Sequence, residues 1–117
     1  MATLAVYNTD GKEVDKIDLS DNANCAILWR IIVHHGYAHQ KHKAIEEASE
    51  MIEALTRDLN GQGDRRNIAE EMADCYIMLA QLELIYGNHG DVVQFVRDKL
   101  ARTLERVEAE RAGEATS

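Results

Sequence analysis

The chain has 117 residues, of which 45% are hydrophobic and 29% charged, with no proline and few aromatic residues. This is the size of one ordinary domain, and the composition favours uninterrupted helices over a β-sandwich. The formal net charge of -8 disfavours nucleic acid and anionic membrane surfaces as partners, because it repels both.

The first 22 residues predict a β-hairpin arm. Apolar and polar side chains alternate between residues 3 and 19, and the central Asn8-Thr9-Asp10-Gly11 is typical of a tight turn. Two strands alone are only marginally stable in water. We therefore expect this hairpin to pack on the helices or to pair with the sheet edge of a partner.

Apolar residues recur at helical spacing through the rest of the chain. Ser20-Asp21-Asn22 offers N-caps for a first helix, Gly36 predicts a break or kink after it, and Asp64 offers a cap for the third helix. The sequence predicts an all-α fold, a bundle of four to five helices over residues 23–111, followed by a disordered tail at 112–117. The predicted helices cover residues 23–35, about 39–59, about 65–86 and about 93–111.

The third predicted helix is apolar on nearly every side, from Ile68 to Ile85. Such a helix needs cover on every side, which four short helices in a monomer supply poorly. We therefore expect the chain to form a homo-oligomer.

Acidic residues occur twice in the same pattern. The segment from Ile45 to Met51 and the segment from Ala69 to Cys75 both read apolar, Glu, Glu, two spacers, acid, apolar, at an offset of 24 residues. Residues three apart share one face of a helix. Two antiparallel helices carrying these pairs would bring four carboxylates together, namely Glu47, Glu50, Glu71 and Asp74.

The neighbours of these acids indicate which way they face. The stripe of Glu47 and Glu50 continues to Ala54, and the stripe of Glu71 and Asp74 continues to Met78, so both lead into apolar packing. Glu46, Ser49, Glu53 and Arg57 instead form a polar stripe typical of a solvated face. Four inward carboxylates raise one another's pKa and destabilise a fold unless a cation binds. Mg2+ is the expected ion, with Mn2+ as a substitute.

These segments resemble a known family, the MazG-like all-α NTP pyrophosphohydrolases. The resemblance rests on Glu46-Glu47-Ala48-Ser49-Glu50 and Glu71-Met72-Ala73-Asp74, and it extends from about Gly36 to Val107. It implies cleavage of a nucleoside triphosphate between its α and β phosphates, giving a nucleoside monophosphate and pyrophosphate. It also implies a dimer or a pair of dimers. Carried over by motif, Glu47, Glu50, Glu71 and Asp74 bind Mg2+, and Glu46 is a candidate base, although its stripe predicts an outward position.

Substrate phosphates need positive charge beyond the metal. Lys99, Arg102 and Arg106 share one face of the fourth predicted helix and are the candidates for this contact. The alternative for them is a solvated basic face that pairs with nearby glutamates. Gln40 and Lys43 precede Glu47 on its own stripe, so they are candidates for contact with the base or a phosphate; otherwise they are polar residues at a helix start.

Three alternatives stay open. His35, His39 and His42 follow one another at helical spacing and are a rival transition-metal site. A phosphoribosyl-ATP pyrophosphatase shares the general helical plan. A non-enzymatic helical dimerisation module would need no metal at all.

Cysteine usage and the N-terminus bear on location. Cys25 and Cys75 form no disulfide framework or zinc motif, and we expect both to be small buried apolar residues. The sequence shows no apolar run of membrane-spanning length and no secretion-signal pattern. We expect a cytoplasmic protein.

Overall fold

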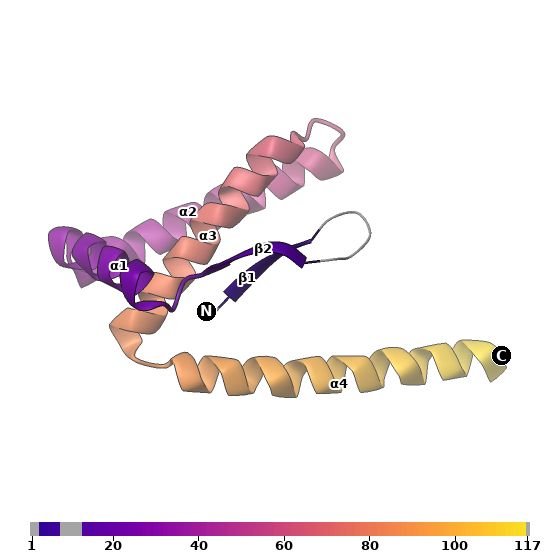
Figure 1. Cartoon of the computed structure of the whole chain (residues 1–117). Helices are drawn as coiled ribbons and strands as arrows, with labels where there is room; N and C mark the ends of the chain where they lie inside the picture. Colours follow the sequence, from indigo (N-terminus) through magenta and orange to yellow (C-terminus); the bar gives the residue numbers. More distant parts are fainter. Residues whose placement is uncertain (1–2, 8–12, 117) are drawn as a thin grey trace. The chain divides into compact units, whose positions relative to one another are not determined.

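The computed structural model describes the backbone of residues 3–7 and 13–116, and the side chains of residues 17–114. The predicted all-α fold with a short N-terminal hairpin is confirmed (Figure 1). By contacts the chain divides into two compact units, Met1–Gly87 and Asn88–Ser117. The elements in chain order are β1 (Thr3–Tyr7), β2 (Glu13–Asp18), α1 (Asn22–His35), α2 (Tyr37–Leu59), α3 (Arg65–Tyr86) and α4 (His89–Thr116).

The two strands form an antiparallel pair in which Leu4 lies opposite Ile17, with an irregularity in the register between Val6 and Tyr7. The predicted turn at residues 8–11 lies outside the described residues. Leu19, just after β2, packs against Leu28 of α1 and Ala80 of α3. The end of the hairpin arm is thus anchored on the helices, as its marginal stability requires.

Both ends of α1 follow the predicted signals. The Asp21 carboxylate accepts a hydrogen bond of 2.7 Å from the backbone N–H of Asn24, which caps the start. Gly36 ends the helix, and its N–H donates to the carbonyl of Ile32 at 2.7 Å. Gly36 has φ +91° and ψ 157°, a conformation open almost only to glycine. The predicted break between the first two helices is confirmed at this residue.

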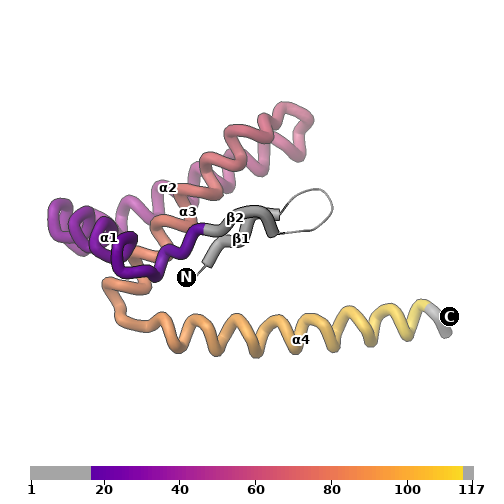
Figure 2. Tube along the Cα trace, viewed as in Figure 1, coloured from indigo at the N-terminus to yellow at the C-terminus, as the bar shows by residue number. Residues whose placement is uncertain are grey.

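Helices α2 and α3 lie side by side and run in opposite directions (Figures 1 and 2). A short loop joins them, and the Asp64 carboxylate accepts hydrogen bonds from the N–H groups of Arg66 and Asn67 at the start of α3. Ala54 of α2 and Met78 of α3 are buried, and α1 contacts both helices. This antiparallel pair is the frame on which the acidic residues are placed.

Helix α4 forms the second unit and is longer than predicted. It begins at His89 and continues to Thr116, through residues for which we predicted a disordered tail. Alanine and glutamate, which favour helices, outnumber the single Gly113 in this stretch, and no proline stops it. Its apolar side chains are open to solvent in this chain: Phe95 is 61% exposed and Leu100 66%. The assignment of residues 23–111 to one helical domain stays a prediction.

Large apolar side chains are also exposed on the first unit. Ile45 and Ile52 of α2 and Met72 and Leu79 of α3 are all 45% exposed or more. An apolar groove of about 410 Å³ runs beside Leu19 and α3. Within the part of the chain that the structure describes, no helix is both long and apolar enough to cross a membrane.

Candidate metal centre

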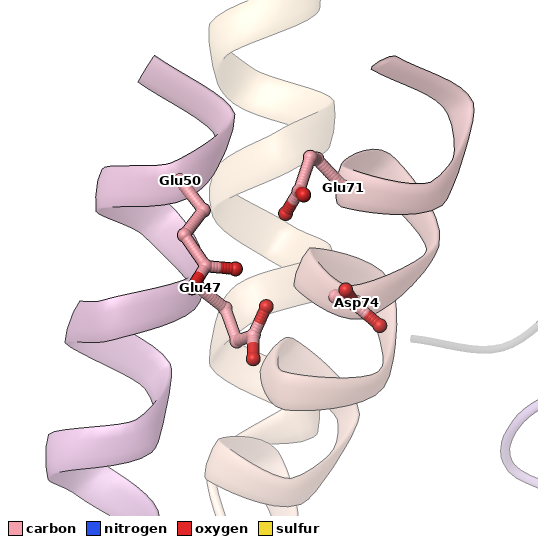
Figure 3. A group of neighbouring side chains, drawn as sticks. All are labelled: Glu47, Glu50, Glu71 and Asp74. Carbon is pink, nitrogen blue, oxygen red and sulfur yellow. The ribbon is translucent and has the colours of Figure 1, made fainter. Parts of the chain in front are cut away.

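Four carboxylates from α2 and α3 meet where the two helices face each other (Figure 3). One oxygen from each of them lies within 4.8 Å of the corresponding oxygens of the other three. The group comprises Glu47 and Glu50 of α2 and Glu71 and Asp74 of α3. The structure therefore brings together the four acids that the repeated sequence pattern predicted.

The helical stripes explain this placement. Ala54, one stripe position beyond Glu50, is only 3% exposed, and Met78, one beyond Asp74, is 6% exposed. Because residues three and four apart share a helix face, the packing of Ala54 and Met78 between the helices turns the acids in the same direction. The inward orientation predicted for both stripes is confirmed.

Burial within the group is uneven, and two oxygens lack partners. Glu47 is 7% exposed, whereas the other three acids are more open to solvent. The Oε2 atoms of Glu47 and Glu71 are buried and accept no hydrogen bond from the described residues. A buried carboxylate oxygen without a partner destabilises a fold unless a cation binds it. The donor set contains only carboxylate oxygens, which suit a hard divalent cation such as Mg2+ or Mn2+.

Electrostatics in the group also favour a cation. The negative charge of Glu47 is the main cause that raises the pKa of Glu50 above its ordinary value, and burial adds to it. Burial is the main cause for Asp74, whose pKa is also raised by the charge of Glu47. Burial and the neighbouring acids raise the pKa of the Cys75 thiol as well. A bound divalent cation would reverse these penalties by stabilising the ionised carboxylates.

Lys43 supplies positive charge at the edge of the group. Its Nζ lies 3.1 Å from Oε1 of Glu47 and 3.5 Å from Oε1 of Glu46. The hydrogen bond to Glu47 is the main cause that raises the pKa of Lys43. Lys43 therefore partners one oxygen of Glu47, while the other, buried oxygen finds no partner in the part of the chain that the structure describes.

Glu46 has a more mixed position than its stripe predicted. Its side chain is 57% exposed, as expected for the solvated face, yet it also lines the cleft beside Glu47. Further along the same stripe, Arg57 pairs with Glu53 at 2.6 Å, and both side chains are exposed. The solvated stripe is therefore confirmed, and Glu46 lies at its border with the site.

A cleft of about 440 Å³ opens next to the acids. Gln40 and Lys43, the two substrate candidates on α2, both line it. Gln40 is 3% exposed and donates a hydrogen bond from Nε2 to Oε1 of Gln81 at 2.7 Å. Sequence reasoning missed Gln81, which is 2% exposed. Its signal was available, because it is the one polar residue in an apolar run from Ile77 to Leu82.

The histidines predicted as a rival metal site are differently arranged. The rings of His35 and His39 stack at a centroid distance of 4.7 Å, and both residues line the cleft, whereas His42 is exposed. We searched the described residues for groups of three or more His, Cys, Asp or Glu side chains that lie close enough together to hold one ion. The four carboxylates form such a group. The histidine stripe does not form such a group.

The three basic candidates predicted for phosphate contact lie on α4. Lys99, Arg102 and Arg106 are exposed on α4, in the second unit. Their contact with substrate phosphates stays a prediction.

Comparison of the chain with family models, with curated proteins and with solved structures found no match. The site is therefore interpreted from its own geometry, and the resemblance to MazG-like enzymes stays a hypothesis.

Proposed function

We propose that this protein is a Mg2+-dependent nucleoside triphosphate pyrophosphohydrolase. The observation that carries the proposal is the set of four carboxylates with oxygens within 4.8 Å of one another. Two of these carboxylates have a buried oxygen that finds no partner among the described residues. Mg2+ typically joins protein carboxylates to the phosphates of a substrate. The resemblance to MazG-like enzymes in the two acidic motifs supports the same reaction.

In this proposal the residues divide the work by position. Glu47, Glu50, Glu71 and Asp74 hold Mg2+, which would supply neutralisation of phosphate charge and a lower pKa for an attacking water. Lys43 lines the cleft next to Glu47, so its ammonium would be available to a substrate phosphate there. Glu46 borders the cleft, so its carboxylate is the candidate to accept the proton of the water.

The reaction adds one water across the anhydride between the α and β phosphates. The water oxygen bonds to one phosphorus, the bridging oxygen leaves with the other phosphate group, and the products are a nucleoside monophosphate and pyrophosphate. No covalent bond to the protein is needed, because water is the nucleophile. Positioning and charge neutralisation are therefore all that the side chains supply.

A homo-oligomer, as a dimer or a pair of dimers, is part of the same proposal. The large apolar side chains exposed on α3, and separately on α4, support it, because association of two chains would remove them from water. A cytoplasmic location agrees with a triphosphate substrate and with the lack of a membrane-spanning helix among the described residues.

The test is pyrophosphate release from a panel of canonical, deoxy and modified triphosphates with Mg2+. It compares the wild type with Glu50→Gln, which keeps the size of the side chain and removes its charge. The matched control is Glu53→Gln, because Glu53 is an exposed acid on the solvated stripe of the same helix, where it pairs with Arg57. We expect a loss of at least about 100-fold in Glu50→Gln and little change in Glu53→Gln.

Equal activity in the wild type and Glu50→Gln would refute the metal-site assignment. Activity confined to phosphoribosyl-ATP, supplied in the same panel, would replace the substrate with that of a phosphoribosyl-ATP pyrophosphatase. No pyrophosphate from any substrate, together with no effect of Mg2+ on the melting temperature, would favour a non-enzymatic helical module.

A further inference from the structure

We propose that the cleft beside the acids binds the base of the nucleotide, and that the buried amide pair of Gln40 and Gln81 selects that base. This inference rests on the proposed function. It names the part of the site that distinguishes one triphosphate from another, whereas the acids and Lys43 contact groups common to all triphosphates.

The cleft adjoins the acidic group. Two acids of the group, Glu47 and Asp74, line the cleft. Lys43, which pairs with Glu47, lines it as well. A nucleotide whose phosphates reach the metal centre therefore has its remaining parts at the cleft. A volume of about 440 Å³ is within the usual range for small-molecule sites.

The side-chain amides of Gln40 and Gln81 are buried, which is unfavourable in itself. Gln40 is 3% exposed and Gln81 2%. A core between helices packs at least as well with leucine or methionine, because amide groups lose hydration when they are buried. Two facing glutamines, contributed by residues 41 positions apart, are therefore poorly explained by packing alone.

The hydrogen bonds of the two glutamine amides run in a defined direction. The Gln40 oxygen accepts from Nδ1–H of His39 at 2.8 Å, and the Gln40 nitrogen donates to the Gln81 oxygen at 2.7 Å. Among the described residues, the Gln81 nitrogen donates one long contact, of 3.7 Å, to the sulfur of Met78. An amide nitrogen carries two hydrogens, so each glutamine retains one N–H for a ligand in the cleft. The chain of bonds also holds both amides in one orientation.

The walls of the cleft combine apolar side chains with flat histidine rings. Ile31, Ile77 and Met78 provide apolar contacts, and the parallel rings of His35 and His39 provide flat ones. Because Nδ1 of His39 donates to Gln40, its Nε2 is an acceptor when the ring is neutral. A flat heterocycle that accepts from an amide N–H at one point of its edge and donates at another fits these walls. This is the chemistry of a nucleobase.

The experiment measures binding, independently of turnover. Isothermal titration with Mg2+ compares the α,β-imido analogues of four nucleoside triphosphates, which resist cleavage at the proposed bond, with inorganic tripolyphosphate, which has no base. In the wild type, we expect at least one analogue to bind about ten-fold or more tightly than tripolyphosphate, and the four bases to differ among themselves. The NMR signals of the Gln40 and Gln81 side-chain amides should shift with that analogue and stay in place with tripolyphosphate.

Variants then locate the selectivity. Gln81→Leu should reduce the spread among the four bases to about two-fold while tripolyphosphate binds as before. Gln40→Met, a second unbranched and apolar replacement, should do the same if Gln81→Leu fails to fold. The control is Gln62→Leu, an exposed glutamine in the loop between α2 and α3, which should keep the wild-type spread.

The outcomes separate this inference from the proposed function. Equal affinity of the wild type for tripolyphosphate and all four analogues would overturn the base cleft alone, and so would an unchanged spread in a folded Gln81→Leu or Gln40→Met variant. Failure of every triphosphate and of tripolyphosphate to bind with Mg2+ would overturn the proposed function and this inference together.

Discussion

The sharpest prediction concerns the buried acid Glu47. Its replacement by glutamine keeps the volume and removes one charge from the acidic group. The charge of Glu47 is the main cause of the raised pKa of Glu50 and a contributing cause for Asp74, so its removal relieves repulsion in the metal-free protein. It also removes the most buried carboxylate of the candidate metal centre. The same substitution should therefore stabilise the metal-free protein and abolish its response to Mg2+.

The size of the Mg2+ response follows from linkage. A ligand at ten times its Kd that binds only the folded state adds about 1.4 kcal/mol to the free energy of unfolding. For a chain of 117 residues, this corresponds to a rise in melting temperature of about 4 to 8 °C. In Glu47→Gln the rise should fall to about 1 °C or less, while the metal-free melting temperature should increase by a few degrees, about 2 °C or more.

The assay is thermal unfolding followed by circular dichroism, with and without Mg2+, at fixed protein concentration and with NaCl added to match ionic strength. Glu53→Gln serves as the control, because Glu53 is exposed and pairs with Arg57 on the solvated stripe. It should retain the wild-type response to Mg2+. A Glu47→Gln protein whose melting temperature still rises with Mg2+ as in the wild type would refute the metal centre.

Three further predictions rest on other contacts. In the absence of nucleotide, Lys43→Met should bind Mg2+ about two- to five-fold more tightly than the wild type, because the ammonium no longer competes for Oε1 of Glu47. The same variant should bind tripolyphosphate less tightly. Weaker Mg2+ binding by the variant in titration calorimetry would contradict this. The raised pKa values of Glu50 and Asp74 stabilise the metal-free protein below the ordinary values of 4.5 and 3.8, and this contribution is lost as the pH rises through the raised values. Urea unfolding of the metal-free proteins should thus show the wild type less stable than Glu47→Gln at pH 7, by a free-energy difference that shrinks as the pH falls toward 4. A difference that does not change with pH would count against the coupling. Gly36→Ala should lower the free energy of unfolding by about 1 to 3 kcal/mol, because alanine is strained at φ +91°. Gly90→Ala, inside α4 with open space around it, should not lower it. Equal urea midpoints for the two variants would contradict the strain at Gly36.

Much of the candidate metal centre was predictable from the sequence, because the positions of its acids depend on local periodicity. Glu47 and Glu50 share a helix face with Ala54, and Glu71 and Asp74 share one with Met78, whatever the rest of the fold does. The short connection between α2 and α3 then makes the two helices antiparallel neighbours. Caps and glycines fixed the helix ends in the same way, as at Asp21 and Gly36.

The features that sequence reasoning missed depend on contacts between distant residues. Gln81 is a polar residue in an apolar run, and its hydrogen bond to Gln40, 41 positions away, shows where its buried amide finds a partner. Glu46 was placed outward by its stripe, which cannot show that the edge of a cleft reaches it. The extension of α4 to Thr116 was missed for a different reason, since a polar terminal segment was expected to fray despite its favourable helix propensity.

The charges of the site bear on the order in which its ligands bind. Lys43 compensates one of the four clustered acids, which leaves three negative charges without a close cationic partner among the described residues. A triphosphate carries several negative charges of its own, so the metal-free site repels it. One Mg2+ only lessens this repulsion, and neutrality requires a second ion or further basic groups. The nucleotide should therefore bind together with Mg2+, and titration of an α,β-imido triphosphate in EDTA should give no measurable binding. Binding in EDTA as tight as with Mg2+ would place the phosphates away from the four acids.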